Sequence, residues 1–118
     1  MLDDRMLDLA KLMDVASLRA KVHAGNVANQ DTPGYKARAV RFEESFAKAL
    51  EAGDTEEARN ESPEIYERKD LATRLDGNNV SMESEVDQAA RNQLLYNTYL
   101  AMFKGKSKLL FTSMSGNF

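Results

Sequence analysis

The first and last thirds of this 118-residue chain each carry an apolar heptad pattern, and this pair of patterns constrains the fold more than any other feature. In residues 2 to 30 the apolar positions alternate spacings of four and three, and no Pro or Gly interrupts them before Gly25. Such a seam is typical of a helix that packs lengthwise against another helix. At about 1.5 Å per residue, the helix would be roughly 40 Å long. The seam positions are Leu2, Met6, Leu9, Met13, Ala16, Ala20, His23 and Val27.

A second heptad pattern covers residues 81 to 114. Ser81 is a favourable N-cap residue, and the acidic side chains of Glu83 and Glu85 suit the positive end of a helix dipole. The seam positions are Met82, Val86, Ala89, Gln93, Tyr96, Leu100, Phe103, Ser107, Leu110 and Met114. Together the two patterns predict an all-α fold, in which long N- and C-terminal helices form an antiparallel coiled-coil-like pair. Between them lies a short irregular middle segment with room for a small helix or a short strand.

Both helices carry more apolar surface than a two-helix pair can bury. Beside the N-terminal seam lies a second apolar line of Leu12, Val15 and Val22. One interpretation is a broad stripe that faces the core of the same molecule. The other is contact with more than one neighbouring helix, as in a polymer, and self-assembly would cover the excess area. The C-terminal helix has further apolar residues off its seam, namely Leu94, Leu95, Tyr99, Met102 and Leu109.

The stretch from Asn26 to Lys36 ends the first pattern. Pro33 cannot continue a helix, and it pushes Thr32 toward an extended conformation. The order Thr32-Pro33-Gly34-Tyr35 predicts a type II turn, because Pro presets φ at the second position and Gly accepts a positive φ at the third. We therefore expect one structural domain in three parts: a helix and turn in residues 1–35, a middle segment in residues 36–80, and a second helix in residues 81–118.

The middle segment shows weaker signals. Residues 37 to 41 suggest an extended exit from the turn, and Phe42 to Leu50 suggest a short helix because apolar residues recur every four positions. Residues 51 to 62 are acidic with few large apolar side chains, which predicts a solvated, mobile loop. A short strand is expected near Ile65-Tyr66-Glu67. Residues 76 to 79, Asp-Gly-Asn-Asn, form a strong turn signal.

Composition excludes several classes of function. The net charge of −3 argues against general nucleic-acid binding, and the absence of cysteine excludes disulfides and thiol chemistry. No run of 18 or more apolar residues predicts a transmembrane helix, and the acidic N-terminus does not resemble a cleaved secretory signal. His23 is the only histidine and lies in a seam, so we interpret it as structural. With no nucleophile motif, phosphate loop or metal spacing, we expect no enzymatic activity and no cofactor or metal.

One family resemblance rests on residues at both ends of the chain. Asn26-Val27-Ala28-Asn29 followed by Asp31-Thr32-Pro33-Gly34-Tyr35-Lys36 resembles the N-terminal signature of bacterial flagellar rod and hook proteins. The form of the turn, together with Gly77-Asn78-Asn79-Val80 and Asn92-Gln93-Leu94-Leu95-Tyr96, is most similar to the B-type proximal rod proteins. The resemblance covers two parts of the chain, from about residue 10 to 42 and from about residue 75 to 112. The sequence departs from the common pattern with Val27 in place of Ile and with Phe111-Thr112-Ser113 near the end.

This resemblance implies a structural role. Subunits of the family pair their terminal helices and stack into a hollow shaft that transmits torque and conducts exported subunits. The implied partners are further copies and other rod subunits, the adaptor subunit that joins the rod to the MS ring, and the flagellar export gate. The implied location is the periplasmic basal body, reached through the flagellar type III apparatus. Alternatives are a cytoplasmic helical adaptor, another coiled-coil interaction protein, or a different axial rod protein.

The candidate functional residues therefore fall into two groups. The turn motif consists of Asn26, Asn29, Asp31, Thr32, Pro33, Gly34 and Tyr35. The residues expected to support helix packing and assembly are Leu2, Met6, Leu9, Met13, Val27, Val86, Ala89, Tyr96, Leu100, Phe103 and Leu110.

Overall fold

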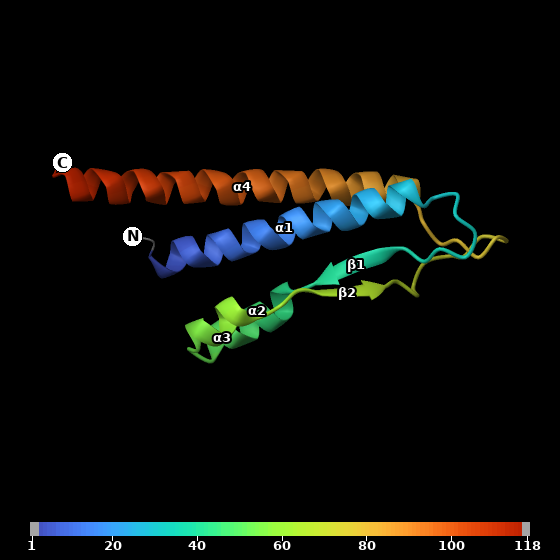
Figure 1. Cartoon of the computed structure of the whole chain (residues 1–118), viewed down its shortest axis with the longest axis horizontal. Coiled ribbons are helices and arrows are strands. Elements are labelled where there is room, and N and C mark those ends of the chain that lie inside the picture. Colours follow the sequence, from blue (N-terminus) through green and yellow to red (C-terminus); the bar gives the residue numbers. More distant parts are fainter. Residues whose placement is uncertain (1–2, 117–118) are drawn as a thin grey trace.

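The computed structural model of the chain describes residues 3–116 and is elongated, with principal extents of 65 × 29 × 15 Å. Two long helices run along its length, and a smaller group of elements lies beside one of them (Figure 1). The elements in chain order are α1 (Asp4–Ala28), β1 (Arg38–Arg41), α2 (Glu43–Glu51), α3 (Thr55–Asn60), β2 (Glu64–Glu67) and α4 (Met82–Ser115). The prediction of a mostly helical chain with long terminal helices is confirmed.

Capping residues fix where the long helices begin. The side chain of Asp3 accepts a hydrogen bond of 2.8 Å from the Met6 amide at the start of α1. Ser81 caps α4, as the sequence predicts, by accepting a 3.3 Å hydrogen bond from the Ser84 amide. These side chains satisfy amides that have no partner inside the helix.

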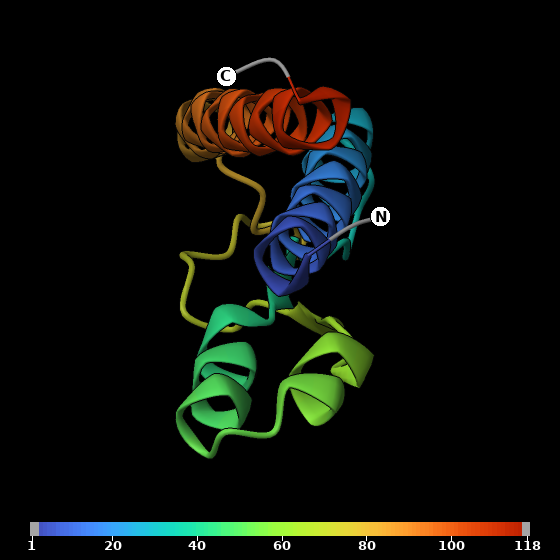
Figure 2. The ribbon, with the colours of Figure 1, turned by 90° about the vertical axis from the view of Figure 1, so that its left-hand side faces the viewer.

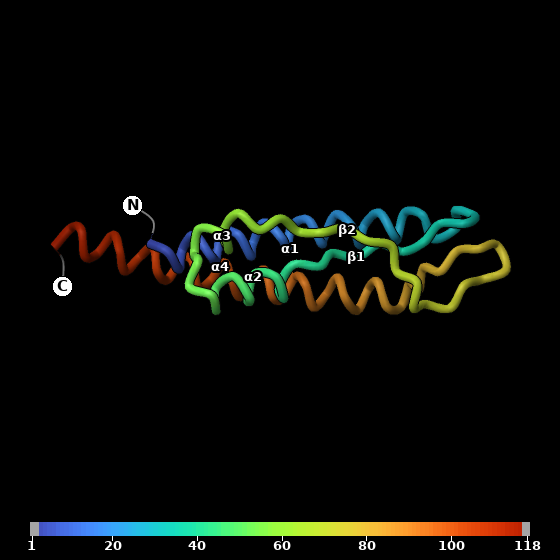
Figure 3. Tube along the Cα trace, turned by 90° about the horizontal axis from the view of Figure 1, so that it is seen from below, coloured from blue at the N-terminus to red at the C-terminus, as the bar shows by residue number. Residues whose placement is uncertain are grey.

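The two long helices lie side by side with opposite chain directions and cross at an angle (Figures 1 and 3). Contacts between them follow the same order, since Ala16 of α1 contacts Asn92 while His23, later in α1, contacts the earlier residue Glu85. The C-terminal end of α4 runs on past the first turn of α1 in both views.

The middle lobe, which we define as residues 38–67, packs against the side of α1 that faces away from α4 (Figure 2). Val15 of α1 packs in one buried cluster with Val40 of β1 and with Phe42 and Phe46 at the start of α2. The Phe42 and Phe46 rings stack with centroids 5.1 Å apart. Burial of each such side chain contributes about 1.5–3 kcal/mol, so the main apolar core lies between α1 and the middle lobe.

This core decides between the two interpretations of the second apolar line on α1. Leu12 and Val22 lie half-buried against the cluster that contains Val15. The line is therefore a stripe that faces the core of its own molecule. It is not free for contacts with neighbouring copies.

Two expectations for the middle segment need correction. The fold is not purely α, because β1 and β2 pair in antiparallel register, with Val40 opposite Ile65. Residues 51 to 62 do not form a mobile loop, because they contain α3. Asp54 caps α3 by accepting a 2.9 Å hydrogen bond from the Glu57 amide, and Ala58 is fully buried against the core. One small apolar residue and one cap are enough to order this acidic stretch, and an average over its composition does not reveal them.

Candidate assembly surface and the corner that positions it

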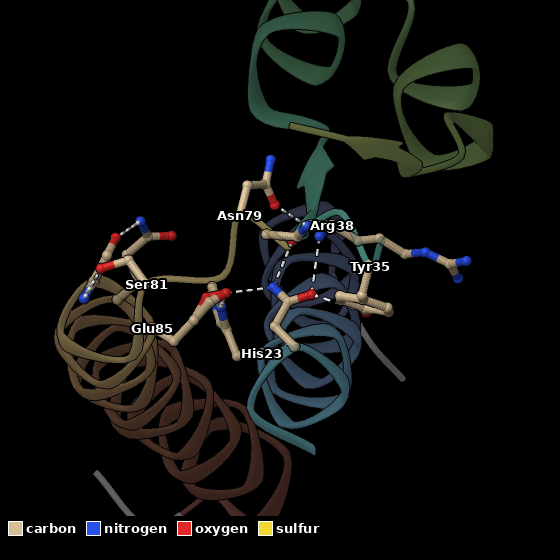
Figure 4. A network of polar contacts seen from close by, with 10 residues as sticks. His23, Tyr35, Arg38, Asn79, Ser81 and Glu85 are labelled. Atoms are coloured by element: carbon tan, nitrogen blue, oxygen red, sulfur yellow. Dashed lines mark hydrogen bonds and ion pairs between the residues drawn. The ribbon is translucent and has the colours of Figure 1, made fainter. Parts of the chain in front are cut away.

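The corner of the molecule, where α1 ends and α4 begins, is held by a buried polar network centred on Asn26 (Figure 4). The Asn26 amide nitrogen donates to the Arg38 carbonyl at 2.8 Å and also to the Glu85 carboxylate. Its side-chain oxygen accepts from the Tyr35 hydroxyl at 3.1 Å and from the Arg38 amide at 2.9 Å. Asn26 is 0% exposed, so all its polar atoms are satisfied by the protein itself.

Glu85 brings α4 into this network. Its carboxylate is 5% exposed and lies 3.4 Å from Nδ1 of His23, which is also buried. A buried carboxylate is costly unless donors surround it, and here Asn26 and His23 provide the contacts. His23 is thus a structural residue between the two long helices.

A second motif, from Arg74 to Val80, closes the same corner. Asn78 is fully buried, and its amide group donates to the carbonyls of Asn29 and Thr32 at 2.8 and 2.9 Å. The Asn79 side chain accepts from the Ala37 amide at 2.6 Å and donates to the Arg68 carbonyl at 2.8 Å. Two of the motifs that carry the family resemblance, the turn motif and the stretch Gly77 to Val80, therefore meet in space.

Two glycines allow the motifs to approach each other. Gly34 and Gly77 both have positive φ, 76° and 86°. A Cβ atom on Gly77 would lie 3.2 Å from the Gly34 Cα, and the Gly34 amide donates to the Asp76 carbonyl at 2.8 Å. The Tyr35 amide donates to the Thr32 carbonyl at 3.2 Å, which together with φ at Gly34 confirms the predicted type II turn.

The other turn-motif residues lie at the outside of the corner. The Asn29 side chain donates to the Gly25 carbonyl at 2.8 Å and accepts from the Thr32 hydroxyl at 3.0 Å, so it closes the end of α1. Asp31 and Pro33 are exposed.

The predicted packing residues differ widely in burial. Met6 and Leu9 are buried at 1% and 6% exposure, whereas Val86 is 59% exposed. Leu2 lies outside the described residues. The remaining positions are half-buried: Met13, Val27, Ala89, Tyr96, Leu100, Phe103 and Leu110.

At two positions of α4, the buried residue is the one just before the residue that the apolar pattern predicts to be buried. Glu85 and Asn92 are buried, while Val86 and Gln93 are exposed. Asn92 donates a 2.8 Å hydrogen bond to the Ala16 carbonyl of α1. Reasoning from apolar residues missed these two polar positions. Their spacing could have identified them, because a second series with spacings of three and four passes through both. The series is Met82, Glu85, Ala89, Asn92 and Tyr96.

Most of the large apolar residues of α4 remain uncovered in the single chain. Leu95, Met102 and Leu109 recur every seven residues and are 40%, 52% and 72% exposed. A row of exposed large apolar side chains on one helix face is a candidate site of protein association. The other exposed large apolar residues of this helix are Val86, Leu94, Phe111 and Met114.

Charged side chains near α4 form ion pairs with one another. An open hollow of about 700 Å³ between α4 and the middle lobe is lined by Arg19, Glu43, Arg68 and Asp70, among others. The Arg19 guanidinium lowers the pKa of Glu43 through a two-point hydrogen bond. Arg68 likewise lowers the pKa of Asp70, whose carboxylate in turn raises the pKa of Arg68.

Burial also raises the pKa of Tyr99 on α4.

Within residues 3–116, no group of three or more His, Cys, Asp or Glu side chains is placed to bind a metal ion. None of the helices in that range has the length and apolar character required to cross a membrane.

Comparison with characterised proteins identifies the family. The chain is 30% identical over 118 residues to the flagellar basal body rod protein FlgB of Bacillus subtilis, with 92% of each chain covered. It is 33% identical over 116 residues to FlgB of Cereibacter sphaeroides, with 91% of each chain covered. The chain belongs to the FlgB family of flagellar basal body rod proteins.

A third relative matches over a similar share of the chain. FlgB of Escherichia coli is 29% identical over 123 residues, with 89% of each chain covered. No family model matches the chain. The relatives are named as rod proteins, and an exposed apolar helix on a rigid corner is an arrangement suited to a structural FlgB subunit.

Proposed function

We propose that this chain is a structural subunit of the bacterial flagellar proximal rod. Its two long helices act as an antiparallel, coiled-coil-like unit that packs with other copies and other rod subunits into the drive shaft. The assembled shaft transmits torque and conducts exported subunits through its centre. The protein performs this role without catalysis or a cofactor.

The observation that carries the proposal is the uncovered apolar face of α4. Met102 and Leu109 are 52% and 72% exposed, whereas the second apolar line of α1 is covered by the middle lobe. Removal of apolar surface from water is worth about 25 cal/mol per Å², so neighbouring subunits gain stability by covering this face. The buried corner around Asn26 holds α4 at a fixed angle to α1, which a stiff shaft requires.

We further propose the position of the subunit in the organelle. It lies at the periplasmic base of the rod, and it contacts the adaptor subunit that joins the rod to the MS ring and the export gate. It reaches this place unfolded, through the flagellar type III apparatus. A chain without cysteines suits that route, because it forms no disulfides on leaving the cytoplasm.

Purification of basal bodies tests the proposal. Cells that lack the gene should be non-motile, and a plasmid copy should restore motility. An antibody against the chain should detect it in basal bodies from the complemented cells. If the chain stays in the cytoplasmic fraction while basal bodies are complete, the proposal is wrong and a cytoplasmic adaptor role is favoured.

A further inference from the structure

An apolar groove runs between α1 and α4 near the corner. It has a volume of about 480 Å³, and it is lined by small or short apolar residues that include Ala20, Ala24, Val27, Val86 and Ala89. Ala20, Ala24 and Val86 are exposed rather than covered by the molecule's own side chains. The groove adjoins the hollow that the middle lobe forms with α4, because His23 and Asn92 line both, but none of these five apolar residues lines that hollow.

The C-terminal part of α4 carries large apolar side chains that are mostly exposed. Phe111 and Met114 are 74% and 72% exposed. Their neighbours Leu110, Thr112 and Ser113 line an open hollow with Asp3, just before the start of α1. Counting about 100° per residue, Met114 lies about 20° and Phe111 about 80° around the helix from Phe103, so Met114 continues the face that packs against α1 and Phe111 flanks it.

Charge distinguishes the two ends of α4. Residues 104 to 115 contain Lys104, Lys106 and Lys108 and no acidic residue. Near the groove, Glu83 and Asp87 line a hollow that shares Val86 with it. Asp87 is paired with Arg91 at 3.0 Å, whereas Glu83, in the first turn of α4, forms no ion pair within residues 3–116.

We propose that the groove of one copy receives the C-terminal end of α4 from a second copy, with Phe111 and Met114 seated against Ala24, Val27 and Val86. One molecule cannot make this contact alone, because 25 residues of continuous helix between positions 86 and 111 span roughly 38 Å. The lysines before Phe111 then lie near Glu83 of the neighbour. Such a head-to-tail contact uses two different surfaces and leaves both ends open, so it propagates along an axis.

This inference rests on the proposed rod function and specifies one contact within it. A chain without cysteine allows a direct test by thiol cross-linking, since the only thiols present are those introduced. The variants Ala24→Cys and Met114→Cys change exposed side chains and should leave the fold intact. Mixed and treated with a short bifunctional thiol reagent, the two purified chains should give a cross-linked dimer that contains one of each.

The double variant should give a ladder of higher species, whereas either single variant alone should not. A matched control pairs Ala24→Cys with Asn97→Cys, which is exposed on the same helix but outside the proposed contact. Equal cross-linking of the control pair, or none with the Ala24→Cys and Met114→Cys pair, would overturn the proposal. Adding Phe111→Asp should lower the cross-linked yield by about tenfold or more, because a charge would be buried in the groove.

The same double variant in cells separates this proposal from the rod function itself. Basal bodies that contain the chain but show no cross-link between positions 24 and 114 would refute the contact and leave the rod function standing. Absence of the unmodified chain from complete basal bodies would refute the rod function.

Discussion

The Asn26 amide of α1 donates a hydrogen bond to the Glu85 carboxylate of α4, 59 residues further along the chain, where both side chains are buried. This contact joins the end of one long helix to the beginning of the other. Because Asn26 also binds the backbone of Arg38 and the hydroxyl of Tyr35, a single side chain fixes the helices and the turn together.

Asn26→Ala should destabilise the folded chain by roughly 2–4 kcal/mol, because Glu85 loses a donor and the Arg38 amide and Tyr35 hydroxyl lose their acceptor. Urea unfolding followed by circular dichroism measures the change. Asn97→Ala, on the exposed surface of α4, serves as a control and should change stability by less than about 0.5 kcal/mol. Equal effects from the two variants would mean that the corner network adds little stability.

Phe42→Ala should cost about 3–5 kcal/mol, since the ring is 1% exposed and stacks on Phe46 in the core between α1 and the middle lobe. Leu75→Ala removes a comparable apolar side chain that is wholly exposed, and it should have almost no effect. The same unfolding experiment checks both. A small loss for Phe42→Ala would show that the middle lobe is not the main core.

Gly77→Ala should destabilise the chain by about 1–2 kcal/mol, because a Cβ would approach the Gly34 backbone and because φ is positive there. Gly25→Ala provides a contrast within α1, where a Cβ meets nothing within 4 Å. It should stabilise the helix by about 0.5–1 kcal/mol. Opposite signs in thermal unfolding are the expected result, and a Gly77→Ala variant as stable as the parent would contradict the close approach at the corner.

The ion pair between Arg19 and Glu43 should make stability fall in acid. Since the folded state lowers the pKa of Glu43, its contribution is present above the ordinary carboxyl pKa and is lost as pH falls through the lowered value. Glu43→Gln should therefore be less stable than the parent at neutral pH and similar to it in strong acid. Glu44→Gln, at an exposed neighbouring carboxyl, should leave this pH dependence unchanged, and an equal effect would contradict the assignment.

The sequence predicts the long helices, the Ser81 cap and the type II turn because each depends on local chemistry. It could not predict that the two family motifs meet, because that contact depends on how the chain returns after the middle segment. The register of α4 was misjudged for a related reason. Glu85 and Asn92 are buried since Asn26, His23 and the Ala16 carbonyl lie opposite them, and such partners are visible only after folding.

The sequence alone predicts only in part which apolar side chains the molecule buries and which it leaves exposed. The excess on both helices is plain from the sequence, but nothing local decides which excess the molecule covers itself. The middle lobe covers the stripe of Leu12, Val15 and Val22, so the large apolar side chains that stay exposed lie mainly on α4. This division follows from the packing of α2 and α3, whose short acidic sequence gives little sign of a core role.

The central claim is that the exposed face of α4 builds the rod, and Met102→Asp tests it most directly. This side chain is 52% exposed in the single chain, so the purified variant should keep the helical content and unfolding midpoint of the parent. Asn97→Asp, a polar exposed site on the same helix, is the matched control. The measurement is the amount of each variant in basal bodies from cells that contain no other copy. We predict normal incorporation of Asn97→Asp and loss of Met102→Asp with loss of motility; normal incorporation of Met102→Asp would contradict the claim.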